Sequence, residues 1–311
     1  MAQYYAQRAA AGLILTEATS VTPMGVGYAH TPGIWSREQI EGWKLTTKAV
    51  HKAGGRIFLQ LWHVGRISHP IFLNGALPVA PSAIAPKGNV NLLLPKRAYE
   101  VPRALEIGEI AGIIEAYRRG AENAQAAGFD GVEVHGANGY LLDQFLQDVS
   151  NQRMDYGGSI ENRARLMLEV TDAVASVWGP GRVGMHLAPR GDSHSMGGSD
   201  LTETFTYVAR ELGQRRIAFI CAREYIAEGR LGPKLKAAFG GVYIVNERFS
   251  KTQAEEAILA GEADAVAFGK AFLANPDLVR RLADDIPLNE WDTATFYTPG
   301  AKGYTDYPVM A

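Results

Sequence analysis

Short apolar runs alternate with amphipathic helical stretches along most of the 311-residue chain, and this alternation restricts the possible folds more than any other feature. Runs such as residues 242–245 are typical of parallel strands that are buried on both faces. The repeated strand–helix pattern predicts a parallel sheet with helical crossovers, and the number of repeats indicates a (β/α)8 TIM barrel. The predicted strands begin near residues 13, 56, 131, 183, 217, 242 and 265.

These strands number seven, whereas a closed barrel of this type has eight. The chain opens with a helix-like stretch, residues 2–11, of the kind that follows a strand. We therefore expect the first strand to be missing, so that either the natural protein begins further upstream or another segment or subunit fills the gap. Ladder groups near Leu13 and Val266 would otherwise lack partners, at about 1–3 kcal/mol for each buried group.

Length and composition favour a single barrel domain over residues 1–311, with a long excursion at about residues 70–103. The formal charge of -2 lacks the basic excess that nucleic-acid binding requires. Cys221 is the only cysteine, and no apolar run reaches the roughly 20 residues that cross a bilayer. We expect a cytoplasmic protein, a monomer or homodimer, whose partner is a small molecule and neither nucleic acid nor membrane.

The stretch from Gly131 to Tyr140 contains the strongest candidate for a functional site. A buried strand ends at His135 and turns through glycines, so that His135, Asn138 and Tyr140 emerge together at its carboxyl end. Ligand crevices of parallel α/β folds lie at the carboxyl ends of the strands. His and Asn three residues apart can both donate hydrogen bonds to one ligand oxygen, and the Tyr hydroxyl adds an acid. The triplet suits a polarised carbonyl.

The pattern His-x-x-Asn-x-Tyr resembles the Old Yellow Enzyme family of flavin-dependent ene-reductases, and the resemblance covers nearly the whole chain. Several further motifs carry it in order. They are residues 141–146, 150–153, 156–163, 268–270, 274–278 and 303–308. Members of this family typically open with an extra segment that includes the first barrel strand, which this chain lacks.

The resemblance implies an FMN-dependent oxidoreductase that reduces the activated C=C bond of α,β-unsaturated carbonyl or nitro compounds. NADPH or NADH would serve as hydride donor in a ping-pong mechanism. His135 and Asn138 would hold the substrate oxygen, and Tyr140 would protonate the α carbon. The implied cofactor-binding residues are Ala18, Gln60, His186, Glu247, Arg248, Gly269 and Lys270, and the implied substrate-binding residues are Trp62 and Tyr297.

Three of these positions depart from the family pattern. His186 and Lys270 stand where the family usually has Arg, and Glu247 stands where it often has Gly. Lys lacks the planar, two-pronged fork of Arg, and His is charged only where its surroundings favour the imidazolium. We expect reduced flavin to be stabilised less at His186, and FMN to bind more weakly than in relatives that possess the missing strand.

Two alternative functions are open at this stage. A barrel aldolase or isomerase could use the same phosphate loops, but it would need a Schiff-base lysine or a carboxylate at a strand end, and Lys270 lies in the phosphate loops instead. A catalytically impaired flavin- or ligand-binding barrel is the other alternative, because the N-terminal segment is missing.

The loops beyond the second predicted strand complete the expected site. His63 and His69 follow that strand, but two histidines without a third ligand are a weak metal pattern, so we expect both to be structural and no metal to bind. Residues 70–103 are rich in Pro, Asn and Gly, and we expect them to wall the substrate pocket.

Overall fold

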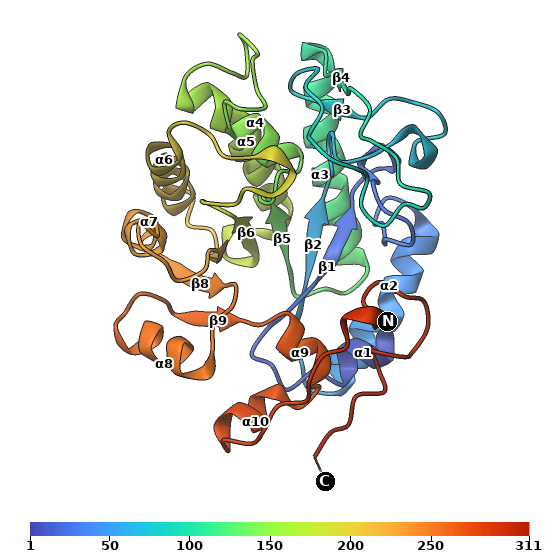
Figure 1. The fold of residues 1–311 in the computed structure, drawn as a ribbon, viewed down its shortest axis with the longest axis vertical. Coiled ribbons are helices and arrows are strands. Elements are labelled where there is room, and N and C mark those ends of the chain that lie inside the picture. Colours follow the sequence, from blue (N-terminus) through green and yellow to red (C-terminus); the bar gives the residue numbers. More distant parts are fainter. Residues whose placement is uncertain (311) are drawn as a thin grey trace.

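The computed structural model describes residues 1–310, and its central feature is a curled sheet of parallel strands with helices around the outside (Figure 1). The sheet has seven strands in the order β1-β2-β5-β6-β7-β8-β9. They are β1 (Ile14–Ser20), β2 (Ile57–Trp62), β5 (Gly131–His135), β6 (Val183–Leu187), β7 (Phe219–Arg223), β8 (Val242–Asn246) and β9 (Ala265–Ala267). All seven predicted strands are confirmed, and the largest error in a start is two residues, at Phe219 against the expected residue 217.

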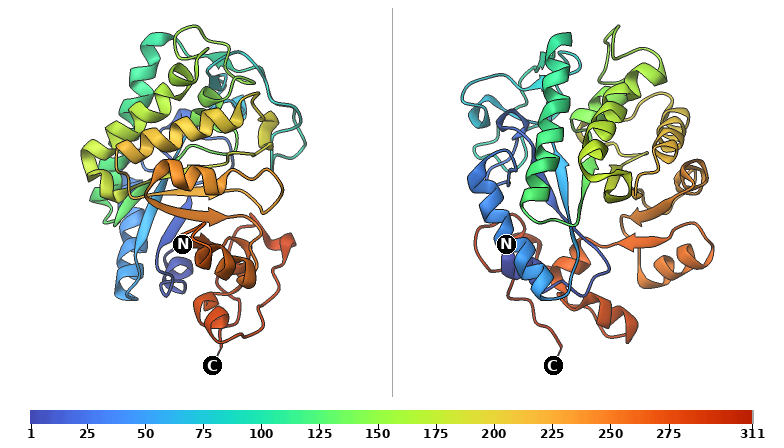
Figure 2. Two further views of the ribbon diagram at one scale, coloured as in Figure 1. Left: turned by 90° about the vertical axis from the view of Figure 1, so that its left-hand side faces the viewer. Right: turned by 180° about the vertical axis from the view of Figure 1, so that it is seen from behind.

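Helices connect successive strands and cover the outer face of the sheet, as the two further views show (Figure 2). They are α1 (Ala2–Ala6), α2 (Arg37–Lys52), α3 (Ile107–Ala126), α4 (Leu141–Leu146), α5 (Ile160–Trp178), α6 (Leu201–Gln214), α7 (Gly232–Phe239), α8 (Lys251–Leu259), α9 (Lys270–Ala274) and α10 (Leu278–Ala283). Helix α2 begins after Ser36, which forms a reciprocal capping box with Gln39. None of the helices in residues 1–310 is both long enough and apolar enough to cross a membrane.

Alternate residues of each strand belong to two separate cores. One set, including Leu59, Val132 and Met185, packs between the sheet and the helices. The other set points into the barrel, where Phe58 and Phe219 lie with ring centroids 5.9 Å apart. Glycines make room for these two rings, since a Cβ at Gly131 would lie 2.3 Å from the Phe58 ring and one at Gly184 would lie 2.2 Å from the Phe219 ring.

The barrel is short of one strand, as the sequence indicated. Strands β1 and β9 form the two ends of the sheet, and no pairing joins them within residues 1–310. Arg8, just after α1, links the segments on either side of this gap. Its guanidinium donates to the carbonyl oxygens of Phe272 (3.0 Å), Leu273 (2.6 Å) and Tyr304 (3.1 Å). Figure 1 shows α1 beside α9 and the C-terminal segment.

The excursion at residues 70–103 contains a 3-10 turn (Pro70–Phe72) and one short strand pair, β3 (Val79–Ala80) with β4 (Arg103–Ala104). It lies beside the upper end of β2 in Figure 1. The Arg153 guanidinium, which follows α4, donates to the carbonyl oxygens of Pro81 (3.3 Å) and Leu105. This arginine fastens the excursion to the segment that follows the β5 site.

Arg8 is 1% exposed, so we predict that Arg8→Met lowers the free energy of unfolding by about 3 kcal/mol or more, because the variant loses several hydrogen bonds from a buried cation. Urea denaturation followed by circular dichroism measures this change. The control is Arg37→Met at the exposed start of α2, where about 0.5 kcal/mol or less is expected. Equal effects of the two substitutions would show that Arg8 does not hold the open side of the barrel together.

Candidate functional site

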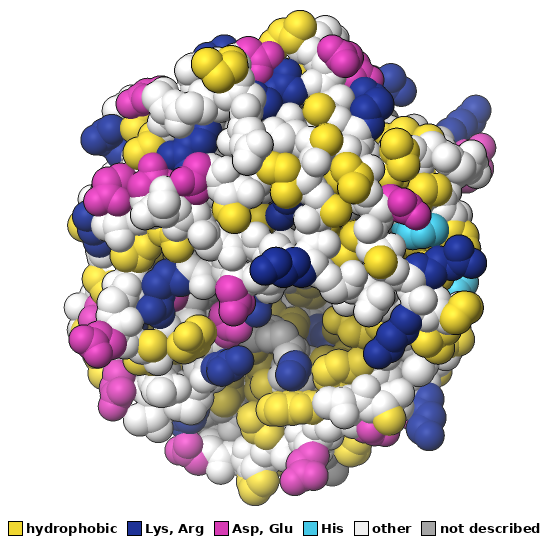
Figure 3. All heavy atoms as spheres, turned by 45° about the horizontal axis from the view of Figure 1, so that its top comes forward, with side chains coloured by type: hydrophobic (Ala, Val, Ile, Leu, Met, Phe, Trp, Pro, Cys, Tyr) yellow, Lys and Arg dark blue, Asp and Glu magenta, His cyan; other side chains and the backbone are white. Residues whose placement is uncertain are grey.

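Polar side chains gather at the carboxyl ends of the strands, which point toward the top of Figure 1 for β2 and β5. When that end is turned toward the viewer, the surface is hollowed and Lys and Arg side chains border the hollow (Figure 3). His135, Asn138 and Tyr140 follow β5 at this end, as predicted.

His135 is buried at the end of β5, and its surroundings determine both its charge and its tautomer. Burial, with the neighbouring His186, holds the pKa of His135 well below its usual range, so the ring is neutral. The backbone N–H of Ala137 donates to His135 Nδ1 at 3.4 Å. An acceptor at Nδ1 places the single ring proton on Nε2. His135 therefore offers one N–H donor to a ligand.

Asn138 lies in a turn of left-handed backbone, with φ of 58° followed by 76° at Gly139. Only glycine fits at position 139, because a Cβ there would also lie 2.9 Å from the Ser193 carbonyl oxygen. The Arg223 guanidinium donates to Asn138 Oδ1 at 2.8 Å. Since arginine can only donate, this contact fixes the amide orientation and leaves the Asn138 NH2 group free for a ligand.

Tyr140 lies beside His135, with ring centroids 5.1 Å apart, and against Trp62, with centroids 4.9 Å apart. Its hydroxyl lies 2.8 Å from that of Tyr28, in the loop after β1. Burial, together with Tyr28, raises the pKa of Tyr140 well above its usual value. The phenol keeps its proton at neutral pH, which is the state that a proton donor needs.

Glu133 lies between Gln60 and His186 inside the barrel. No sequence pattern marked Glu133 as a site residue. Gln60 pairs with Glu133 in the β2–β5 register, and its Nε2 donates to Glu133 Oε2 at 2.5 Å. Burial raises the pKa of Glu133 to about 7. Burial also lowers the pKa of His186 to about 4, so His186 is a neutral ring and not a substitute for a permanent cation.

Two further implied residues are Ala18 and Tyr297. Ala18 pairs with Gln60 in the β1–β2 register and packs against the cluster of Trp62, Val64 and Ile67. Tyr297 is 75% exposed and follows the 3-10 turn Thr293–Thr295.

The loops after β8 and β9 carry the residues implied for a phosphate. Glu247 and Arg248 have φ of 93° and 61°, so the loop keeps a conformation that glycine favours although neither residue is glycine. Arg248 and Lys270 are exposed, and within residues 1–310 neither forms an ion pair with a carboxylate. Glu247 instead accepts from Arg223 at 2.9 Å. Gly269 precedes α9, whose first N–H groups lack partners within the helix.

These groups fit the FMN that the resemblance implies. The Gln60 amide can both accept and donate at the edge of a pyrimidine ring. Two cations without carboxylate partners and the backbone N–H groups at Gly269 and Lys270 suit a phosphate. These implied residues lie on β1, β2 and β6 and in the loops after β8 and β9, while the triplet lies at the end of β5.

A cavity of about 370 Å3 opens beside the triplet. Its walls come from two loops, one of which belongs to the 70–103 excursion. The lining residues are Lys87, Gly88, Asn89, Asn91, Tyr99, Ser193, His194 and Ser195. His194 Nδ1 lies 2.7 Å from the Asn138 carbonyl oxygen, so this loop is attached directly to the site.

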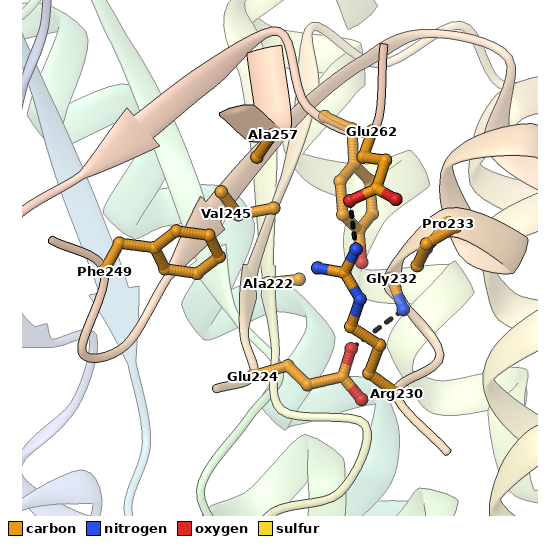
Figure 4. Close-up of a pocket in the computed structure, with 10 residues that line it drawn as sticks. Ala222, Glu224, Arg230, Gly232, Pro233, Val245, Phe249, Ala257 and Glu262 are labelled. Atoms are coloured by element: carbon orange, nitrogen blue, oxygen red, sulfur yellow. Dashed lines mark hydrogen bonds and ion pairs between the residues drawn. The ribbon is translucent and has the colours of Figure 1, made fainter. Parts of the chain in front are cut away.

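A second cavity lies away from the triplet, between β7, β8 and α7 (Figure 4). Its volume is about 10 Å3, which is enough for one water. Arg230 forms an ion pair with Glu262 there, and Glu224 accepts the Gly232 N–H at 2.8 Å. The cavity is therefore structural.

His63 and His69 have the structural roles that the sequence indicated. His63 Nδ1 accepts from the backbone N–H of Gly65 at 3.1 Å, and His69 Nδ1 accepts from that of Ile71 at 3.2 Å. Each ring closes a turn two residues ahead. Tyr28 and Arg223 were not predicted from the sequence. Each reaches the triplet from the end of a different strand, and no local sequence pattern marks either residue.

The sequence and the fold both match a known family. A model of the NADH:flavin oxidoreductase / NADH oxidase family matches residues 1–289. The chain is 43% identical to 12-oxophytodienoate reductase 1 of Oryza sativa subsp. japonica, over 99% of this chain and 84% of that protein. It is also 43% identical to a probable flavin mononucleotide-dependent alkene reductase of Leishmania infantum, over 100% of this chain and 88% of that protein.

Two solved structures share the fold closely. An Old Yellow Enzyme homologue from Zymomonas mobilis superposes with a TM-score of 0.97 at 42% identity, covering 99% of this chain and 89% of that one. Morphinone reductase in complex with tetrahydroNAD superposes with a TM-score of 0.96 at 45% identity, covering 100% of this chain and 89% of that one.

Proposed function

The chain belongs to the NADH:flavin oxidoreductase / NADH oxidase family, and on that premise we propose that it is an FMN-dependent ene-reductase. Its substrates are α,β-unsaturated carbonyl or nitro compounds, and its hydride donor is NADPH or NADH. The whole chain acts as one flavin-binding barrel domain. A likeness to a reductase crystallised with tetrahydroNAD supports a nicotinamide donor.

One observation carries this proposal: three differently fixed donors face the same end of the barrel. His135 is a neutral ring whose Nδ1 accepts from Ala137, so its proton is on Nε2. The Asn138 amide oxygen is held by Arg223, so its NH2 group is free. Two such donors stabilise the charge that develops on a carbonyl or nitro oxygen during reduction.

Tyr140 supplies the third donor. Its raised pKa keeps the phenol protonated, and the 2.8 Å contact with Tyr28 orients the hydroxyl. We assign it the transfer of a proton to the α carbon of the substrate.

Bound FMN would supply the hydride chemistry. The residues assigned to hold it are Ala18, Gln60, His186, Glu247, Arg248, Gly269 and Lys270, with Trp62 and Tyr297 shaping the substrate space. Arg248, Lys270 and the Gly269 N–H would neutralise the phosphate. The Nδ1–H of the neutral His186 donates to the Cys221 carbonyl oxygen, so this ring can only accept a hydrogen bond at Nε2 and brings no fixed charge to the cofactor.

The strands argue against the aldolase alternative. No strand of the described sheet contains a lysine, and Lys270 is an exposed residue at the start of α9. A Schiff-base enzyme needs a lysine within reach of the site, usually in an apolar pocket that lowers its pKa.

We predict that Tyr140→Phe slows alkene reduction by roughly 10²-fold or more while NADPH still bleaches the flavin at nearly the normal rate, because only the second half-reaction needs the proton. Stopped-flow absorbance measures each half-reaction separately. Tyr28→Phe is the matched control, since it removes the neighbouring hydroxyl and leaves the assigned donor in place. Equal slowing of both half-reactions, or of neither, would remove Tyr140 from this role.

Arg223 is assigned as a positioning residue that acts through Asn138. Arg223→Met should lower kcat/KM for the alkene about tenfold, and Arg223→Lys should recover part of the loss. The decisive comparison is a double-mutant cycle. In an Asn138→Ala background, Arg223→Met should cause little additional loss. An undiminished loss in that background would show that Arg223 acts by another route, and Arg210→Met on α6 controls for loss of surface charge.

A further inference from the structure

Three possible metal ligands from three neighbouring strands meet inside the barrel. They are Glu133 of β5, His186 of β6 and Cys221 of β7, and one ligand atom from each lies within 4.8 Å of the other two. All three residues are buried. The strand register produces this meeting, because His186 pairs with Cys221 and Gly184 pairs with Glu133. Ligands from three adjacent parallel strands form a site that no sequence spacing would display.

Hydrogen bonds to neighbouring groups already orient two of the three ligands. Gln60 donates to one carboxylate oxygen of Glu133, and His186 Nδ1 lies 3.0 Å from the Cys221 carbonyl oxygen. Such outer contacts set the orientation of a ligating carboxylate and the tautomer of a ligating imidazole. A neutral ring that donates one N–H keeps a lone pair on the other nitrogen.

The second carboxylate oxygen of Glu133 indicates what the cluster lacks. Oε1 is buried and has no hydrogen-bond partner in residues 1–310. No Lys or Arg of these residues forms an ion pair with Glu133. A buried carboxylate without a cation is costly, and it either takes up a proton or binds a positive ion.

We propose that Glu133, His186 and Cys221 form a binding site for a borderline-soft divalent cation, with Zn²⁺ as the ion that fits the ligand set best. Mg²⁺ and Ca²⁺ prefer oxygen ligands alone, whereas one thiolate, one imidazole and one carboxylate suit Zn²⁺. Tetrahedral ligand atoms lie roughly 3.4 Å apart at usual Zn²⁺ bond lengths. Side-chain rotations that move each ligand atom by about 1 Å would bring the three atoms to these distances. A water would complete the tetrahedral set as fourth ligand.

This site shares His186 with the residues assigned to FMN, so ion and cofactor compete for one ring. Each should weaken the binding of the other by the same factor. The ligands of the metal site are Glu133, His186 and Cys221 alone, so zinc binding does not depend on whether the protein reduces alkenes.

The test uses Zn²⁺ added as chloride to the 311-residue chain freed of FMN. Calorimetry should give one ion per chain, and X-ray absorption at the zinc edge should show one sulfur at about 2.3 Å. Cys221→Ser should weaken binding by about 100-fold and remove the sulfur signal, since loss of an outer-shell partner alone costs 10–100-fold. Thermal melting without zinc checks that the variant folds.

His51→Ala is the matched control, because the exposed His51–Asp130 pair is a surface position where zinc could bind adventitiously. This variant should bind Zn²⁺ as the original chain does. Adding FMN should raise the apparent dissociation constant for zinc. Sulfur-free coordination, or equal affinity in the Cys221→Ser variant, would overturn the proposal whether or not the protein reduces alkenes.

Discussion

Parallel pairing of β2, β5, β6 and β7 in a fixed register decides which side chains share the interior of the barrel. Gln60 lies opposite Glu133, and His135 lies opposite His186. Because side chains alternate between the faces of a strand, a slip of one residue in β5 would exchange Glu133 and His135 for Val132 and Val134. The polar interior and the apolar outer core therefore depend on the same backbone ladder, and Gly131 and Gly184 permit it by giving space to the Phe58 and Phe219 rings.

The loops at the strand ends convert this frame into a site. Arg223 connects the Asn138 amide with Glu247 on the loop after β8, and His194 contacts the backbone of the same Asn138 turn. Groups from β5, β6, β7 and β8 thus depend on each other for orientation. A donor held in this way needs little reorganisation when charge develops on a substrate oxygen.

The strands and the β5 triplet were predictable from the sequence, and there are physical reasons why other helices and site residues were not. Continuous apolar runs identified all seven strands, and the triplet was visible because His135, Asn138 and Tyr140 lie within six residues. Short helices such as α4 and α9 carry too few turns to show a period. Tyr28, Arg223 and Glu133 were missed because their roles arise from partners on other strands, which local sequence cannot show.

With FMN bound, this end of the barrel would pass hydride from a nicotinamide to an alkene. An anaerobic cycle on the purified protein tests it directly. We expect a yellow protein whose flavin absorbance is bleached by NADPH or NADH and restored in full by one equivalent of an enone such as cyclohexenone. A colourless protein that does not take up FMN, or a bleached flavin that the enone fails to restore, would contradict the account.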